Sequence, residues 1–196
     1  MSTQSRPQLV LASASPRRRE LLEQIGIRFV IQAADIDESP RHHEGPEELV
    51  QRLAAAKSKQ ISSRMSNKIP VLGADTIVVL GDKVLGKPSG REQAIEMLSA
   101  LSGCEHRVLS AVSLRAGNHG HLISETRVWF RKLKISEIEA YCATSEPLDK
   151  AGSYAIQGYG AVFVSRIEGS YSGVVGLPIY ETAMLLNQAD IRVPGD

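Results

Sequence analysis

Apolar positions along the chain follow two periods, one typical of buried strands and one of helices with a single apolar face. In the first half, short apolar runs predict strands, and apolar residues spaced three or four apart predict helices between them. The predicted strands cover residues 8–12, 29–33, 76–80 and 83–85, and the predicted helices cover residues 16–25, 46–64 and 91–101. Gly26 after the first helix and Pro46 at the start of the second are residue types expected at helix ends.

In the second half, the pattern favours antiparallel strands around a turn at Gly117-Asn118. A capping box of Ser136 and Glu139 predicts the start of a short helix. The predicted elements are strands over 105–115, 121–134 and 161–167, the short helix as far as 144, and a last helix from 176 to about 189. This order predicts an α/β fold with a mixed, curved central sheet, flanking helices and two lobes around a substrate cleft.

The length of 196 residues and the hydrophobic content of 42% suit one compact domain with a sizeable core. No repeat or long linker interrupts the sequence. We therefore expect a single domain over residues 1–196, with residues 1–7 and 191–196 as loose tails.

Charge and composition exclude several classes of protein. The formal net charge is +1 and aromatic residues make up 5% of the chain, so there is neither a basic stripe nor a set of stacking platforms for nucleic acid. No apolar run is long enough to span a bilayer, and the polar N-terminus lacks a signal-peptide core. Cys104 and Cys142 have neither metal-ligand nor disulfide-framework spacing. We expect a cytoplasmic protein that binds neither nucleic acid nor membranes.

The stretch 9–19 carries the clearest chemical signal. An apolar strand ends in small residues, Ser15 is placed as a helix N-cap, Pro16 as the first helical residue, and Arg17 and Arg18 fill the next positions. A helix N-terminus already carries partial positive charge, so arginine there is unfavourable by about 0.3–1 kcal/mol. An anion at this helix end would reverse that cost, which points to a phosphate or polyphosphate. Ordinary surface arginines are the alternative.

Acidic residues in two places could hold a divalent cation. Asp75 follows Gly73-Ala74 and precedes an apolar strand, where a buried carboxylate is costly unless it is paired or bound to a cation. Asp37 and Glu38 lie in an acidic loop, and their oxygen atoms suit a hard cation such as Mg²⁺. A turn aspartate that accepts from backbone N–H groups and an ordinary solvated loop are the alternatives.

Two lysines and a glycine-rich stretch complete the candidates. Lys57 lies near the middle of a predicted helix, and Lys87 lies in a loop between Gly86 and Pro88. Residues 146–160 are rich in glycine and polar residues, so their backbone could approach a ligand closely, and Gln157 offers a bidentate amide. A surface lysine and a plain irregular connection are the alternatives.

Taken in order, these stretches resemble the Maf family of nucleotide pyrophosphatases from Leu9 to about Leu186. Each motif is weak alone, but their co-occurrence in this order is specific. The motifs are Leu11-Ala12-Ser13-Ala14-Ser15-Pro16-Arg17-Arg18, Asp37-Glu38, Arg52-Leu53-Ala54-Ala55-Ala56-Lys57, Gly73-Ala74-Asp75-Thr76, Gly86-Lys87-Pro88, Asp149-Lys150-Ala151-Gly152-Ser153-Tyr154-Ala155-Ile156-Gln157-Gly158 and Val174-Val175-Gly176-Leu177-Pro178.

The resemblance implies metal-dependent hydrolysis of a nucleoside triphosphate between its α- and β-phosphates, giving the monophosphate and pyrophosphate. It also implies a fold like that of the inosine triphosphatases, a divalent cation (Mg²⁺ or Mn²⁺) and a homodimer. The residues it identifies are Asp75, Lys57 and Lys87 as catalytic, Glu38 and Asp75 as metal ligands, and Ser13, Arg17, Arg18, Thr76 and Gln157 as substrate-binding or specificity residues.

The family contains two branches that differ at three of these positions. The branch that acts on dTTP, UTP and related pyrimidine nucleotides is similar to this chain at Arg17, Thr76 and Gln157. A sister branch carries tryptophan, glutamine and glutamate there and prefers 7-methyl-GTP. A member of that sister branch, a purine house-cleaning enzyme of the inosine triphosphate type, and a nucleotide-binding regulator of cell division or septum formation with little turnover are the alternatives.

Overall fold

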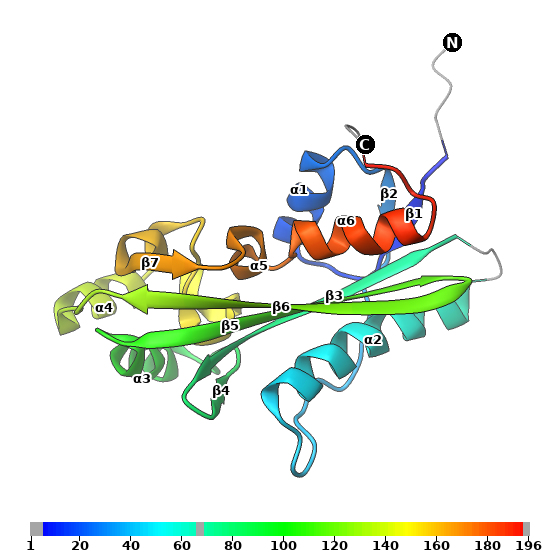
Figure 1. Cartoon of the computed structure of the whole chain (residues 1–196). Helices are drawn as coiled ribbons and strands as arrows, with labels where there is room; N and C mark the ends of the chain where they lie inside the picture. The colour runs from blue at the N-terminus through cyan, green and yellow to red at the C-terminus, as the bar shows by residue number, and fades with distance from the viewer. Residues whose placement is uncertain (1–5, 66–68, 194–196) are drawn as a thin grey trace. The chain divides into compact units, whose positions relative to one another are not determined.

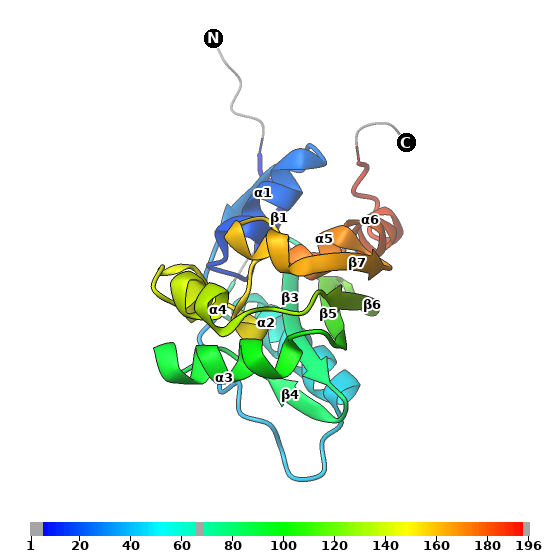
Figure 2. The ribbon, with the colours of Figure 1, turned by 90° about the vertical axis from the view of Figure 1, so that its left-hand side faces the viewer.

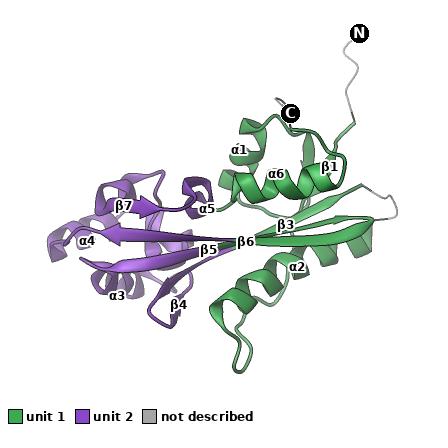
Figure 3. Cartoon of the chain, in the orientation of Figure 1, with its two compact units in different colours: residues 1–75, 110–123, 176–196 green, residues 76–109, 124–175 purple. Residues whose placement is uncertain are grey.

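The computed structural model describes residues 6–65 and 69–193, and the chain divides into two compact units (Figure 3). Unit 1 is drawn from residues 1–75, 110–123 and 176–196, and unit 2 from residues 76–109 and 124–175. Of the tails expected from the sequence, residues 1–5 and 194–196 lie outside the described part. Within it, Ile191 is buried and its N–H donates to the Leu186 carbonyl at 2.9 Å.

Seven strands among the described residues form one mixed sheet in the order β2-β1-β3-β5-β6-β7, with β4 paired to β3. Strand β1 runs parallel to β2 and β3, whereas β4 and β7 run antiparallel to their partners β3 and β6. The strands are β1 (Leu9–Leu11), β2 (Phe29–Ile31), β3 (Val71–Leu80), β4 (Lys83–Leu85), β5 (Glu105–Ala116), β6 (Asn118–Phe130) and β7 (Val164–Glu168). The mixed α/β sheet predicted from the sequence is therefore confirmed.

Unit 1 holds helices α1 (Pro16–Gln24), α2 (Pro46–Arg64) and α6 (Ile179–Gln188). In Figures 1 and 2, α2 and α6 lie on opposite faces of the unit 1 part of strands β5 and β6. Helix α2 has Pro46 at its first position, glutamates in its first turn and Arg64 in its last, as the helix dipole favours. Its buried face includes Leu49, Leu53 and Ile61, at the spacing of a single apolar stripe.

Unit 2 holds helices α3 (Arg91–Leu101), α4 (Ile135–Cys142) and α5 (Tyr171–Val175) and three short 3₁₀ segments, Glu146–Asp149, Ala151–Ser153 and Tyr159–Phe163. Helices α3 and α4 lie side by side (Figure 2). Leu98, Phe130, Tyr154 and Phe163 are among the buried residues that form the core of this unit.

The region before Asp75 differs from the expectation. Gly73-Ala74-Asp75 was expected to precede a strand, but it lies inside β3, which begins at Val71. The strand starts earlier because Val71 and Leu72 already pair with β1. Asp75 is therefore a strand residue and not a turn residue, which changes what its carboxylate can contact.

Other element boundaries differ as well, among them those of α4 and β7. The capping box at α4 uses Glu137, whose Oε2 accepts from the Lys134 N–H at 2.9 Å, and not Ser136 with Glu139. The choice follows from Arg131, which donates to both oxygens of the Glu137 carboxylate. The strand expected over 161–167 begins only at Val164, because the residues before it form a 3₁₀ turn. No described helix has the length and apolar character needed to cross a membrane.

Candidate active site

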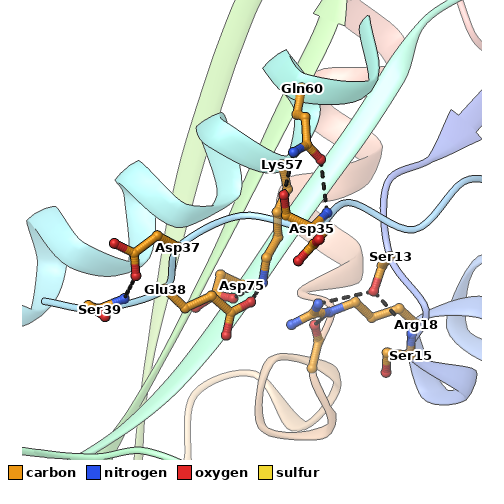
Figure 4. A network of polar contacts seen from close by, with 11 residues as sticks. Ser13, Ser15, Arg18, Asp35, Asp37, Glu38, Ser39, Lys57, Gln60 and Asp75 are labelled. Atoms are coloured by element: carbon orange, nitrogen blue, oxygen red, sulfur yellow. Dashed lines mark hydrogen bonds and ion pairs between the residues drawn. The ribbon is translucent and has the colours of Figure 1, made fainter. Parts of the chain in front are cut away.

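Lys57 lies between two carboxylates in unit 1. Its Nζ is 2.6 Å from Asp75 Oδ1 and 2.6 Å from Glu38 Oε1 (Figure 4). Lys57 and Asp75 are 8% and 6% exposed, whereas about half of the Glu38 side chain is accessible. The three side chains come from α2, β3 and the loop that precedes α2. Lys57 is therefore not a surface lysine. A buried charge persists only when it is paired, and the two carboxylates provide that pairing.

The direction of the Asp75 side chain follows from the strand. Side chains alternate across a strand, so Gly73 and Asp75 face α2, and Thr76 faces the other way. Helix α2 lies close to β3 because Gly73 has no side chain. Two residues further along the strand, the Asp75 carboxylate contacts Lys57 of that helix. Thr76 is half-buried and follows Asp75 directly in the chain, so the candidate catalytic acid and the candidate specificity residue are consecutive residues of β3.

The start of α1 forms a second part of the site in unit 1. The helix begins at Pro16 with Ser15 as its N-cap, as predicted, but Ser15 makes no side-chain cap. Instead Ser13 Oγ accepts from the Ser15 N–H and from Arg18 Nη1, both at 3.2 Å. Arg18 Nε also donates to the Gly176 carbonyl at 2.9 Å, which together with the bond to Ser13 fixes the guanidinium at two points.

Charge links this helix start to the lysine and its two acids. Burial lowers the pKa of Arg18 from its ordinary value, and the nearby Asp75 and Glu38 carboxylates act in the opposite direction. Because arginine stays protonated at neutral pH even so, Arg18 is a fixed positive charge beside the two acids. Arg17 occupies the next position towards the N-terminus of the same helix turn and is half-buried.

The loop that carries Glu38 is fastened to α2 at two points. At one end, Gln60 Oε1 accepts from the Asp35 N–H at 2.9 Å, and Gln60 Nε2 donates to the Asp35 carbonyl (Figure 4). At the other end, Arg52 Nη2 donates to the Ser39 carbonyl at 3.0 Å. Glu38 lies between these two points, so the loop presents its carboxylate to Lys57 from a defined backbone position.

Glu44 holds Arg52 in place. Arg52 donates to both oxygens of the Glu44 carboxylate, at 2.5 and 2.7 Å, and the Arg41 N–H donates to the same carboxylate at 2.9 Å. The hydrogen bond from Arg52 lowers the pKa of Glu44 to about 2. The bidentate pair fixes the guanidinium plane, which leaves Nη2 aimed at the loop.

The other two candidates, Lys87 and Gln157, belong to unit 2 and are exposed. Their segments meet where the Gly152 N–H donates to the Gly86 carbonyl at 3.1 Å. Gly152 has φ +67 and packs so tightly on Val78 of β3 that a Cβ would lie 2.9 Å from that side chain. The Lys87 loop and the start of the glycine-rich stretch are thus adjacent, two residues along β3 from Thr76.

The residues in unit 1 fit a divalent cation that is bound together with a substrate. Within the described residues, no group of three or more His, Cys, Asp or Glu side chains could hold a metal ion. Glu38 and Asp75 contact the same ammonium nitrogen, so their carboxylates lie close enough to share a cation. Mg²⁺ in nucleotide sites is held by one or two carboxylates together with substrate phosphates and water, which matches this donor set.

The sequence reasoning did not single out Arg52 and Gln60 as site residues. A signal for both was available, because the two residues are eight positions apart on α2 and therefore lie on one helix face, two turns apart. What they hold could not be read from that spacing, since their partners are backbone atoms of a loop.

Comparisons with known proteins agree over most of the chain. A family model described as "Maf-like protein" matches residues 8–189. A protein of Alkalilimnicola ehrlichii named "dTTP/UTP pyrophosphatase" is 48% identical over 196 residues, which cover 97% of this chain and 97% of that protein. One of the same name from Methylococcus capsulatus is 52% identical over 179 residues, covering 91% and 89%. A solved structure, the Ham1 protein of Staphylococcus aureus, shares 13% identity, covers 80% of this chain and 79% of its own, and has a TM-score of 0.47.

Proposed function

The chain belongs to the Maf family, and from this premise we propose that it is a nucleoside triphosphate pyrophosphatase that hydrolyses dTTP and UTP. The observation that carries the proposal is the Lys57 ammonium between the Asp75 and Glu38 carboxylates, with Arg18 beside them. Acid and cationic groups gathered in this way suit the cleavage of a phosphoric anhydride. The names of close relatives supply the substrate class.

In the proposed reaction, water attacks the α-phosphorus and the bond from that phosphorus to the bridging oxygen breaks. Pyrophosphate leaves with the electron pair of the broken bond, and the nucleoside monophosphate remains. Asp75 is the group that accepts the proton of the attacking water. Its place in the middle of a paired strand, opposite Lys57, gives it the fixed orientation that a general base needs.

Cationic side chains offset the charge of the triphosphate. The substrate carries about four negative charges at neutral pH, and the leaving pyrophosphate gains more in the transition state. Unit 1 supplies three of these cationic side chains, Arg17 and Arg18 at the start of α1 and Lys57 of α2. In this proposal Lys87, from a loop of unit 2, acts on the same substrate. Cations aimed at the bridging and β-phosphate oxygens lower the barrier more than they improve ground-state binding.

A divalent cation, Mg²⁺ or Mn²⁺, belongs to the proposal, with Glu38 and Asp75 as its ligands. When bound, such an ion lowers the pKa of a coordinated water and neutralises phosphate charge. Lys57 contacts one oxygen of each carboxylate, so it sets the separation of the two ligands and holds them for the ion. The fastening of the loop by Arg52 and Gln60 serves the same end, because it limits where Glu38 can lie.

Base selection in this proposal rests on Gln157 and Thr76, with Arg17 as the third residue that distinguishes the two branches. A glutamine amide can accept from the N3–H of uracil or thymine and donate to a ring carbonyl. A site built on such polar groups rejects a base that leaves them unpaired, by a factor of about 10⁴ where the pairing is complete. We further propose a single catalytic domain that acts in the cytoplasm, as the composition predicts, and that forms a homodimer, as the family resemblance implies.

The test is the release of pyrophosphate from a panel of nucleotides. With Mg²⁺ present, we expect turnover of dTTP and UTP, much less of GTP and 7-methyl-GTP, and one pyrophosphate for each monophosphate. Without a divalent cation, turnover should fall to the background. Preference for 7-methyl-GTP or inosine triphosphate would assign the chain to another substrate class, and nucleotide binding without pyrophosphate release would make it a binding protein.

A further inference from the structure

Gln157 lies in a four-residue turn that is tied down on both sides. The Gly158 N–H donates to the Ala155 carbonyl at 3.2 Å, so Ile156 and Gln157 are the central residues of the turn. Before the turn, the Ala155 N–H donates to the hydroxyl of Tyr141 at 3.3 Å. This fixes the chain where it enters the turn.

After the turn, the chain is held by Glu146. Its Oε2 accepts from the Tyr159 N–H and its Oε1 accepts from the Gly160 N–H, both at 3.0 Å. The same Oε1 accepts from the Tyr141 hydroxyl at 2.8 Å. One carboxylate and one hydroxyl, in contact with each other, therefore hold both ends of the turn.

Two glycines of this stretch have a clear role in that arrangement. A Cβ at Gly158 would lie 2.3–2.5 Å from the Glu146 carboxylate. A Cβ at Gly160 would lie 3.0 Å from the Tyr141 hydroxyl and from the backbone of Ala155. These glycines let the chain close onto Glu146 and Tyr141, which accounts for their presence without any approach to a ligand.

The Tyr141 hydroxyl keeps its proton around neutral pH. Burial raises the pKa of the Tyr141 hydroxyl, and the hydrogen bond to Glu146 raises it further. The phenol therefore stays protonated and keeps its two roles, donor to the carboxylate and acceptor from the Ala155 N–H. Its ring packs against Phe163 with centroids 5.0 Å apart, so the hydroxyl can be removed while the ring stays in place.

We infer that Glu146 and Tyr141 are a positioning pair that holds the turn carrying Gln157 and so sets the base selectivity of the reaction without contact with the nucleotide. The inference rests on the proposed function, in which Gln157 reads the base. Glu146 acts through two backbone N–H groups and a hydroxyl, and none of these bonds depends on the nucleotide.

The experiment compares Glu146→Gln, Tyr141→Phe and Gln157→Ala in wild-type and combined backgrounds, with UTP and CTP as substrates. Glutamine at 146 places an NH₂ group where one carboxylate oxygen now accepts, so it faces a donor with a donor. We expect kcat/KM for UTP to fall about tenfold, mainly through KM, with that for CTP nearly unchanged. The loss of preference for UTP over CTP should match that of Gln157→Ala. Adding Glu146→Gln to Gln157→Ala should lower this preference no further.

Glycine variants give an independent check. Gly158→Ala forces the Glu146 carboxylate to move and should reduce the UTP preference in the same way. Gly90→Ala is the matched control, because Gly90 has an extended backbone and nothing lies within 4 Å of an added Cβ. The control should keep the wild-type preference.

The outcomes separate the inference from the function on which it rests. If wild type prefers UTP and Gln157→Ala abolishes the preference while Glu146→Gln keeps it, the positioning role is overturned and the function stands. If Glu146→Gln lowers kcat/KM equally for UTP and CTP, in either background, Glu146 acts only on folding in general and the inference is again overturned. If wild type hydrolyses neither nucleotide, the proposed function fails, and amide hydrogen exchange over residues 155–161 decides on the pair. Faster exchange in Glu146→Gln supports the anchoring, and unchanged exchange refutes it.

Discussion

Gly73 of strand β3 lies so close to helix α2 that a Cβ added to it would be 2.3 Å from the carbonyl oxygen of Ala54. The added atom would also lie 2.7 Å from the Ser58 backbone nitrogen, and neither backbone atom can swing aside as the end of a side chain could. Ala54 and Ser58 flank Lys57 on the helix, and Gly73 lies two residues before Asp75 on the strand. The close approach of strand and helix is therefore what brings the lysine to its acid.

Gly73→Ala should damage stability and activity together. Helix α2 must move away from β3, which we expect to lower the free energy of unfolding by about 1–3 kcal/mol. The same shift separates Lys57 from Asp75, and a misplacement of about 1 Å can cost 10²-fold in rate. Urea unfolding and pyrophosphate release measure the two effects. Gly90→Ala, which has open space around the new methyl group, should retain activity and lose less stability, because it only weakens the N-cap of α3. A fully active Gly73→Ala protein would contradict this role of the contact.

Asp75→Asn should remove turnover and leave the fold intact. Asparagine has the same shape, and Lys57 keeps Glu38 at 2.6 Å as a counter-ion, so no buried charge is stranded. The loss of a general base typically lowers the rate by about 10²–10⁴-fold. Pyrophosphate release gives the rate, and circular dichroism with thermal unfolding checks the fold. An Asn variant with wild-type activity would show that Asp75 is not the catalytic acid–base group.

Helices α2 and α3 were well predicted because their starts are marked locally. Pro46 and Arg91 begin α2 and α3 at the predicted positions, where Gly45 and Gly90 immediately precede them. The capping box at α4 was misplaced by two residues, because two glutamates, Glu137 and Glu139, compete there and only the Arg131 side chain decides which is used. Local signals fix an element but not a choice made by a distant partner.

The site shows the same limit more strongly. Motif resemblance picked out Lys57, Glu38 and Asp75, but a helix lysine has the same sequence appearance whether it is exposed or buried. Its partners lie 18 and 19 positions away along the chain, on a strand and a loop, so only the packing of β3 on α2 reveals the ion pair. In the sequence alone, Gly73 suggests the break of a strand. Its role in letting α2 approach β3 appears only when the helix is placed against the strand.

Arg52→Lys should lower activity with little effect on stability. Lysine keeps the charge near Glu44 but lacks the planar fork, so it cannot hold both carboxylate oxygens and the Ser39 carbonyl together. The loop then presents Glu38 less accurately, and we expect kcat/KM to fall about tenfold. Arg64→Lys, an exposed change in the last turn of the same helix, is the control for pyrophosphate release. Equal rates for the two variants would show that fastening the loop is unimportant.

His106 predicts how stability depends on pH. The side chain is buried, its Nε2 is 2.9 Å from the Tyr154 hydroxyl, and its ring packs edge-on against Phe130. Burial lowers the pKa of His106 to about 4, so the folded protein keeps it neutral while the unfolded chain takes up a proton near the ordinary pKa of about 6.5. Because the unfolded state binds more protons between these values, stability is full above about pH 6.5 and falls as the pH drops towards 4.

Thermal unfolding from pH 7 to pH 5 measures this effect. The loss should approach about 1.4 kcal/mol for each pH unit below 6.5, or about 2 kcal/mol at pH 5. His106→Gln keeps an amide that can reach the Tyr154 hydroxyl but does not titrate, so the midpoint temperature of the variant should change less over the same range. The comparison cancels the contribution of the carboxylates to the pH dependence of stability, because this contribution is the same in both proteins. Parallel pH profiles for wild type and variant would mean that His106 is not the group whose protonation destabilises the fold in acid.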